Sequence, residues 1–237
     1  MDGLLLLDKP KGITSYKAVE CVKRILGVRK AGHAGTLDPL ATGLLIVCLN
    51  TATKMVPKFM SLDKEYEFVM LLGRETTTDD VEGEVIREVD VFDDVGQRLR
   101  EVVQRFIGEI EQVPPSFSAI KCGGTPLYKL ARRGKAVVPP SRRVFIHNLD
   151  IKRISGRRIF GRVVCSKGTY IRALCRDIGR ALGVGGCLEE LRRTSVGCFR
   201  VEDAIGLMEL EKTQDPAAYV LSGADVILDQ NPERGAS

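Results

Sequence analysis

Apolar runs and alternating patterns along the first third of the chain predict β-strands. Residues 3–7 and 43–50 are continuous apolar runs bounded by turn residues, so each is expected to form a buried strand. Apolar and polar residues alternate over 65–73, which predicts a strand with one face in the core. Residues 79–85, with the sequence DDVEGEV, are expected to form a turn.

Four segments carry apolar residues at helical spacing or residues typical of helix ends. The expected helices run from Thr14 or Ser15 to Gly27, over 99–106 before Gly108, over 125–134, and over 171–182 before Gly183. Residues 143–154 and 157–168 flank Ser155-Gly156, a pattern typical of a β-hairpin. Strands and helices intermix without regular βαβ alternation or a linker, so we expect one α+β domain around a mixed, mostly antiparallel sheet.

The composition argues against membrane, secreted, disulfide-rich and metal-binding proteins. The 237 residues are 44% hydrophobic and 28% charged, enough for one full core. No apolar run approaches the roughly 20 residues of a membrane span, and the N-terminus lacks the features of a signal peptide. Seven cysteines form no CxxC pair and there are two histidines, so neither a disulfide framework nor a metal site is expected. We expect a monomer in the reducing cytoplasm.

Positive charge is concentrated in one third of the chain. Residues 121–200 carry nineteen Lys and Arg against four Asp and Glu, whereas 61–112 and 201–237 are acidic. Arginine dominates the basic segment, and its guanidinium group suits phosphate oxygens. The segment favours a protein that binds a nucleic-acid backbone; the alternative is a solvated basic surface.

The loop GHAGTLDPLATG, residues 32–43, is the strongest candidate for chemistry. Pro39 restricts Asp38 to extended backbone angles, and the glycines allow close approach of a ligand. A carboxylate mounted in this way can serve as a nucleophile or a base. The alternative is an ordinary Asp-Pro turn.

Six sequence blocks, in order and in register, resemble the bacterial TruB-type tRNA pseudouridine synthases from residue 3 to about 200. The blocks are GLLLLDKPKGITS, GHAGTLDPLATGLL, KEYEFVMLLG, VPPSFSAIKCGGTPLYKLARRG, CSKGTYIRALCRDIG and LRRTSVGCF. The resemblance implies the pseudouridine-synthase fold, a mixed sheet flanked by helices with an RNA-gripping insertion. It also implies that the partner is tRNA, bound through its T-stem-loop.

The resemblance implies isomerisation of uridine 55 in the T-loop of tRNA, with Asp38 as the catalytic carboxylate. Uracil leaves its ribose, turns, and is rejoined through C5 without cofactor or metal. The lack of metal-spaced His and Cys and of a phosphate-binding glycine motif agrees with this chemistry. Three routes remain open for Asp38: attack on C6 of the base, attack on C1′ of the sugar, or removal of the C2′ proton.

Other site residues follow from the same resemblance. Tyr66 falls at the tyrosine that stacks on the target base, and Arg172 at the arginine that pairs with the catalytic carboxylate and keeps it ionised. His33 falls at the histidine that helps to extrude the nucleotide, a step that costs about a few kcal/mol of unstacking. Each has a plainer alternative: a core tyrosine, an arginine on phosphate or in solvent, and a surface histidine.

Further residues match the family with weaker roles. Lys9 and Pro10 belong to the first motif, where the role is mainly structural, and Tyr170 and Leu191 match the pocket wall. Residues 114–145 resemble the insertion that closes over the T-loop. Its basic residues would grip phosphates; they are Arg132, Arg133, Arg142 and Arg143.

Residues 1–200 are therefore expected to form the catalytic domain, followed by a short acidic extension, 201–237. Most relatives continue into a PUA-type domain that contacts the acceptor end of tRNA, and here that domain is expected to be absent or vestigial. Three other functions fit parts of the sequence: a tRNA-folding helper with secondary catalysis, a guide-dependent synthase of the dyskerin kind, and a metal-free hydrolase that uses Asp38.

Overall fold

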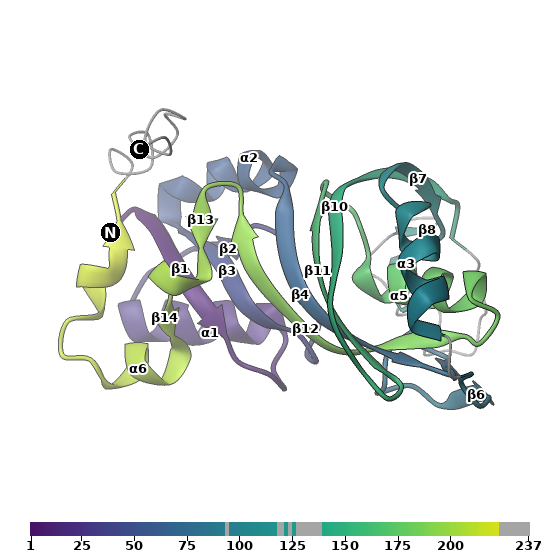
Figure 1. Cartoon of the computed structure of the whole chain (residues 1–237). Helices are drawn as coiled ribbons and strands as arrows, with labels where there is room; N and C mark the ends of the chain where they lie inside the picture. The colour runs from purple at the N-terminus through teal and green to yellow at the C-terminus, as the bar shows by residue number, and fades with distance from the viewer. Residues whose placement is uncertain (93–94, 118–120, 123–124, 127–138, 223–237) are drawn as a thin grey trace, which may run out of the picture. The chain divides into compact units, whose positions relative to one another are not determined.

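The computed structural model describes residues 1–92, 95–117, 121–122, 125–126 and 139–222. The chain divides into two compact units, residues 1–66 with 192–237 and residues 67–191 (Figure 1). The divisions fall inside strands β4 (Lys64–Leu72) and β12 (Gly186–Val196), each of which contributes residues to both units. Because the divisions lie within strands, no linker-like composition marks them in the sequence.

Strand β1 (Gly3–Lys9) organises the sheet of the first unit. It pairs antiparallel with β3 (Thr42–Leu49) along its whole length, from Gly3 opposite Leu49 to Lys9 opposite Gly43. The other pairings are β14 (Ile205–Gly206) parallel to β1, β15 (Val220–Leu221) antiparallel to β1, β2 (Ala31–His33) antiparallel to β3, β12 parallel to β3, and β13 (Phe199–Arg200) antiparallel to β12. The expected mixed, mostly antiparallel sheet is confirmed.

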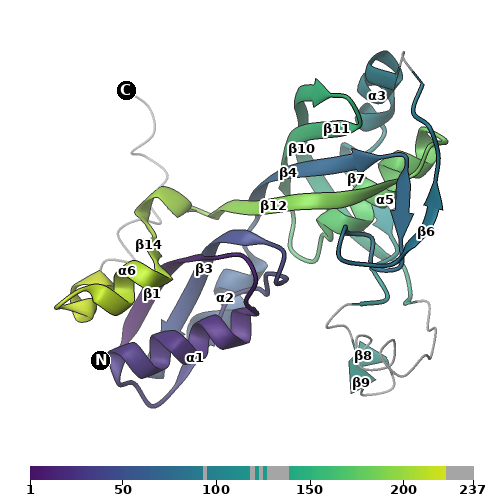
Figure 2. The same ribbon diagram turned by 90° about the horizontal axis from the view of Figure 1, so that it is seen from below.

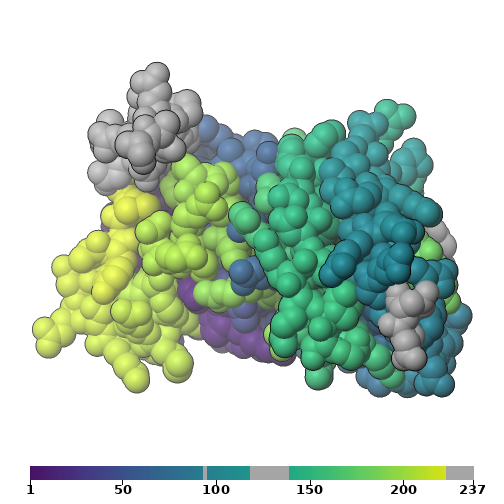
Figure 3. Space-filling view, viewed as in Figure 1, coloured from purple at the N-terminus to yellow at the C-terminus, as the bar shows by residue number. Residues whose placement is uncertain are grey.

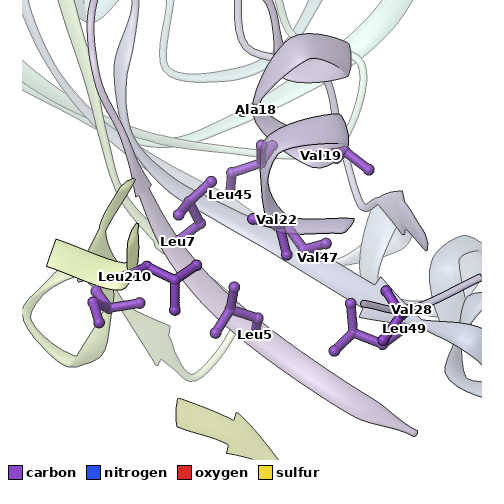
Figure 4. Packing of buried hydrophobic residues seen from close by; sticks show 11 residues of the cluster. Leu5, Leu7, Ala18, Val19, Val22, Val28, Leu45, Val47, Leu49 and Leu210 are labelled. Atoms are coloured by element: carbon purple, nitrogen blue, oxygen red, sulfur yellow. The ribbon is translucent and has the colours of Figure 1, made fainter. Parts of the chain in front are cut away.

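Both faces of β1 and β3 are buried, which explains why these strands are continuous apolar runs in the sequence. Helix α1 (Ser15–Leu26) covers one face (Figures 2 and 4). The cluster beneath it includes Leu5, Leu7, Leu45 and Val47 of the strands and Ala18, Val19 and Val22 of the helix. A second cluster packs Leu4, Leu6, Leu44 and Ile46 with Phe59 of α2 (Val56–Ser61) and with Phe199.

Helix α1 begins and ends where the sequence predicts. The Thr14 hydroxyl accepts a hydrogen bond from the Lys17 N–H (3.1 Å), which caps the start of the helix. Gly27 adopts a left-handed conformation (φ 62°) and ends it.

The second unit contains the strand order β4, β11 (Arg158–Cys165), β10 (Arg142–Ser155) and β7 (Gly108–Gln112). The predicted hairpin is confirmed as β10 and β11, and the last predicted helix as α5 (Ile171–Ala181). Helix α3 (Val95–Gln104) packs against β10, and their atoms adjoin on the face seen in Figure 3.

Several predicted boundaries in this unit were wrong. Helix α3 ends at Gln104, before Phe106, because the chain turns into β7 at Gly108 (φ 98°). The predicted turn is shorter than expected, since β6 (Val85–Glu88) begins at Val85 and pairs with β5 (Arg74–Thr76). The first two residues of the helix expected over 125–134 instead form β9 (Thr125–Pro126), which pairs with β8 (Lys121–Cys122), and residues 127–134 lie outside the described residues.

Some elements had no sequence prediction: β12, the 3₁₀ helix η1 (Asn50–Met55), α2 and α6 (Leu207–Lys212). Residues 32 and 33, expected in the loop 32–43, instead belong to β2, which pairs with β3. The length of β12 is hidden because charged residues interrupt its apolar pattern, and one of them, Arg193, is buried. Within the described ranges, no helix is long and apolar enough to cross a membrane.

Candidate active site

Asp38 lies in the loop between β2 and β3 of the first unit, and the backbone is held on both sides of it. The Ser15 hydroxyl donates to the Leu37 carbonyl (2.9 Å) and accepts from the Leu37 N–H (2.8 Å). The Gly12 N–H donates to the Pro39 carbonyl (2.8 Å). The half-buried carboxylate of Asp38 is therefore presented from a fixed backbone, which is the arrangement that directed chemistry requires.

A buried arginine connects the two ends of this loop. Arg193 of β12 is 1% exposed; its Nε donates to the Leu44 carbonyl (2.7 Å) and its Nη2 to the Gly35 carbonyl (3.1 Å). Gly43 has φ 101°, and a side chain there would collide with the backbone of Arg193. Arg193 was not predicted as a site residue; its signal in the sequence is a second arginine inside an otherwise strand-like segment.

Ser15 was also missed as a site residue, because the sequence offered it only as a possible helix cap. Thr14 caps the helix, which leaves the Ser15 hydroxyl to bind Leu37. Ser15→Ala is expected to destabilise the protein by about 2 kcal/mol and to lower the catalytic rate by about tenfold, because both polar groups of Leu37 lose their partner and Asp38 shifts.

Thr14→Ala is the matched control for Ser15→Ala, because it also removes one hydroxyl from the start of α1. It is expected to cost about 1 kcal/mol through the lost cap and to leave the rate within about twofold. Urea unfolding and single-turnover rates measure the two effects. Equal rates for the two variants would contradict the role assigned to Ser15.

Lys9 lies at the end of β1 and is fully buried. Its Nζ donates to the carbonyls of Pro10 and Ile13, both at 2.9 Å. Burial lowers the pKa of Lys9 to about 8; the nearby Asp38 carboxylate opposes this shift, and the charge of Arg193 adds to it. Lys9 therefore fixes the turn after β1 and interacts electrostatically with the Asp38 carboxylate.

The lowered pKa of Lys9 predicts a pH effect on stability. Between about pH 8 and the ordinary lysine value of 10.5, the unfolded chain holds a proton that the folded chain has lost. Lys9 therefore increases the free energy of unfolding as the pH rises through that interval. Lys9→Met is expected to remove this contribution, whereas the exposed Lys11→Met is expected to keep it. Urea unfolding at pH 8, 9 and 10 measures it, and identical slopes for wild type and Lys9→Met would contradict it.

His33 lies at the end of β2, half-buried. Burial lowers the pKa of His33, and the positive charge of Arg193 lowers it further. The buried Nδ1 has no hydrogen-bond partner among the residues that the structure describes. A neutral imidazole with an unsatisfied nitrogen can receive a polar atom of a ligand without the cost of burying a charge.

Tyr66 belongs to the first unit with Asp38 and His33. It lies on β4 and is 8% exposed. This position is compatible with a base-stacking role and with a plain core role, so its catalytic role stays a prediction.

Arg172 and Tyr170 lie at the start of α5 in the second unit. The Arg172 guanidinium donates to the carbonyls of Thr78 (2.9 Å) and Phe117 (3.0 Å) and lies 3.6 Å from the Asp80 carboxylate. The pairing of Arg172 with Asp38 stays a prediction.

The Tyr170 backbone is held by the side-chain amide of the fully buried Gln112. The amide accepts from the Tyr170 N–H at 2.8 Å and donates to the Tyr170 carbonyl at 3.1 Å. Gln112 was not predicted as a site residue, because a lone glutamine at a strand end carries no signal.

The remaining predicted residues that the structure describes lie in the second unit. The Arg142 guanidinium lies 5.7 Å from the centre of the Tyr170 ring, and the exposed Arg143 pairs with Glu109 at 3.4 Å. Leu191 is half-buried on β12. Arg132 and Arg133 lie outside the described residues. Across the described ranges, His, Cys, Asp and Glu side chains form no group able to hold a metal ion.

Comparison with known proteins identifies relatives along most of the chain. A 213-residue alignment with tRNA pseudouridine synthase B of Syntrophus aciditrophicus is 54% identical and covers 89% of this chain and 67% of that protein. The protein of the same name from Bordetella avium is 46% identical over 224 residues, which cover 94% of this chain and 92% of that protein.

A solved Cbf5–Nop10–Gar1 complex contains a chain of similar fold, with a TM-score of 0.71 and 36% identity. The alignment covers 90% of this chain and 54% of that one, so this chain spans about half the length of that structural relative.

Two family models match consecutive parts of the chain. The TruB family pseudouridylate synthase N-terminal domain matches residues 23–171, and the tRNA pseudouridylate synthase B C-terminal domain matches residues 172–224. The first alone covers more than half of the chain, and the relatives agree with it over nearly the whole length. The chain belongs to the TruB family of pseudouridylate synthases.

Proposed function

We propose that the protein isomerises uridine 55 in the T-loop of tRNA to pseudouridine. The observation that carries this proposal is the presentation of Asp38 on a loop fixed by Ser15, Gly12 and Arg193, in a chain of the TruB family. Relatives at 46% and 54% identity carry the name tRNA pseudouridine synthase B, which supports tRNA as the substrate.

The reaction breaks the bond from C1′ of the ribose to N1 of uracil and forms a bond from C1′ to C5. The hydrogen on C5 leaves to solvent, and N1 gains a proton, so the atoms balance without a cofactor. Asp38 acts directly on the uridine, and its fixed backbone reduces the reorganisation needed to reach the reacting atoms. Arg172 pairs with Asp38 in the complex, and Tyr66 stacks on the target base.

Base extrusion is assigned to His33. The uridine must leave the folded T-loop to reach Asp38, and a planar side chain that takes its place offsets part of the lost stacking. The lowered pKa of His33 favours the neutral ring for this step. Arg142 and Arg143, on β10, are placed among the phosphate contacts.

Free-standing action on tRNA is favoured over action within a guide-RNA particle. The identity is 54% to a tRNA pseudouridine synthase B and 36% to the Cbf5 chain. We assign the catalytic domain to residues 1–200 and expect a monomer in the cytoplasm. Six cysteines among the described residues carry free thiols, which fits a reducing compartment.

Tritium release from a tRNA transcript labelled at C5 of uridine tests the proposal, because C5 loses its hydrogen only when the new carbon–carbon bond forms. The protein alone is expected to release one equivalent of label per tRNA. A transcript with cytidine at position 55 is the matched control and is expected to release none. Salt-dependent tRNA binding without any release would favour a tRNA-folding helper, and release only after addition of a guide RNA would favour a dyskerin-like enzyme.

A further inference from the structure

A second arginine on α5, one turn after Arg172, has no role in the proposed reaction and yet is fully engaged. Arg176 is 8% exposed. Its Nη1 donates to Asp79 (2.7 Å), its Nε to Asp177 (2.9 Å) and its Nη2 to the Val113 carbonyl (2.8 Å). All three nitrogens of a buried guanidinium are thus directed at different acceptors, which requires a set geometry.

The contacts of Arg176 repeat those of Arg172. Each arginine pairs with one of two consecutive aspartates, Arg172 with Asp80 and Arg176 with Asp79. Each also donates to one end of the segment 113–117, at the Phe117 and Val113 carbonyls respectively. The two arginines therefore hold both the turn of Asp79 and Asp80 and the segment 113–117, each at two points. A change in the contacts of Arg176 is expected to move the groups that contact Arg172.

The turn that carries the two aspartates is held by hydrogen bonds to Leu188 of β12 and within itself. The Leu188 N–H donates to the Asp79 carbonyl (3.0 Å), and the Val81 N–H donates to the Leu188 carbonyl (2.9 Å). The Asp80 carboxylate accepts from the Thr78 hydroxyl (2.6 Å). With its neighbours held in this way, Asp79 is fixed relative to Asp80.

Asp79 has an uncommon backbone conformation and a buried carboxylate. Its φ of 62° lies in the left-handed region, which few non-glycine residues adopt, although aspartate and asparagine are the most tolerant of them. Burial raises the pKa of Asp79, although the charges of Arg176 and Arg172 lower it. Although burial opposes the shift, Asp177 and Asp79 raise the pKa of Arg176. An uncommon backbone angle and a buried ion pair at one residue are features that occur at functional sites.

We propose that Arg176 and Asp79 form a positioning pair that fixes the guanidinium of Arg172, and that they act on the isomerisation step and not on tRNA affinity. The proposal rests on the function proposed above for Arg172 and Asp38. The pair holds segment 113–117 at Val113 and the turn at Asp79. These contacts fix the positions of the Phe117 carbonyl and the Asp80 carboxylate, which contact Arg172. Neither residue touches the reacting atoms.

Asp79→Asn is the main test, because asparagine tolerates the left-handed conformation and removes only the charge. With enzyme in excess over labelled tRNA, its rate of tritium release is expected to fall about tenfold, with the tRNA dissociation constant within about twofold. The melting temperature is expected to fall, because the buried Arg176 keeps, among the described residues, only Asp177 as a charged partner. Arg176→Met is expected to show the same loss of rate, and the double variant no more than the larger single loss.

Arg180→Met is the matched control. Arg180 lies one further turn along α5 and pairs with Glu75 at 3.0 Å, and its side chain is 55% exposed. Its replacement is expected to leave rate and affinity within about twofold. Weaker tRNA binding at an unchanged rate in Asp79→Asn, or losses that multiply in the double variant, would overturn the positioning pair.

A readout independent of activity separates this proposal from the proposed function. Solvent exchange of the Arg172 guanidinium protons, assigned by their loss in Arg172→Lys, is expected to be about tenfold faster in Asp79→Asn than in wild type. Unchanged exchange would overturn the positioning pair even if the enzyme is active. Faster exchange in Asp79→Asn than in wild type, together with no tritium release by the wild-type protein, would leave the pair standing and overturn the isomerase instead.

Discussion

Asp38→Asn is expected to lower the rate of tritium release from labelled tRNA by at least about 10⁴-fold. The substitution preserves the size of the side chain and all the backbone hydrogen bonds around it, from Ser15 to Leu37 and from Gly12 to Pro39. Only the carboxylate is lost, and the amide is neither a competent nucleophile nor a base. The loss of rate therefore reports on chemistry alone.

Asp215→Asn is the control for Asp38→Asn. Asp215 caps a 3₁₀ helix, η3 (Pro216–Tyr219), by accepting from the Ala217 N–H at 3.2 Å, and asparagine caps equally well. This variant is expected to keep the wild-type rate. The tRNA affinity of Asp38→Asn is expected to stay within about threefold, since the carboxylate carries no phosphate contact. A residual rate above about one per cent would remove Asp38 from the central role.

Gly43→Ala is expected to have the largest effect on stability. Gly43 has φ 101°, and an added Cβ would collide with the backbone of Arg193. Backbone strain of about 1–3 kcal/mol and overpacking of about 1–3 kcal/mol are expected to add, because β3 and β12 are paired at this point. The protein is expected to lose about 2–6 kcal/mol of unfolding free energy, measured by urea denaturation.

Gly12→Ala is the control that measures the backbone strain of a positive φ without the steric overlap expected at Gly43. Gly12 also has a positive φ, of 88°, but nothing lies within 4 Å of an added Cβ. It is expected to cost the strain alone, about 1–3 kcal/mol. Equal losses for the two variants would contradict the close packing of Gly43 on Arg193.

Local signals in the sequence were sufficient for elements whose apolar pattern is uninterrupted. The runs in β1 and β3 predict strands because both of their faces are buried, and α1 carries a cap at Thr14 and a terminator at Gly27. Strand β12 was not predicted, because a buried arginine is stabilised only by distant carbonyls that no local pattern reveals.

The same limit applies to the candidate site. The Asp-Pro pair and its glycines pointed to the loop of Asp38, because proline and glycine restrict or free the backbone locally. The groups that hold this loop come from elsewhere in the chain: Ser15 is 22 residues from Leu37, and Arg193 is 149 residues from Leu44. Such contacts depend on the tertiary fold, so the sequence alone could not predict them.

The position of Arg193 has a consequence for biosynthesis. The ribosome makes the loop of Asp38 before the guanidinium that joins the Gly35 and Leu44 ends of this loop, because Arg193 follows Leu44 by 149 residues. Until β12 has emerged and paired with β3, a nascent chain has Asp38 but not the fixed geometry of its loop. A fixed loop is thereby linked to synthesis of β12, and a translation product that stops before β12 lacks the contacts that hold the loop of Asp38.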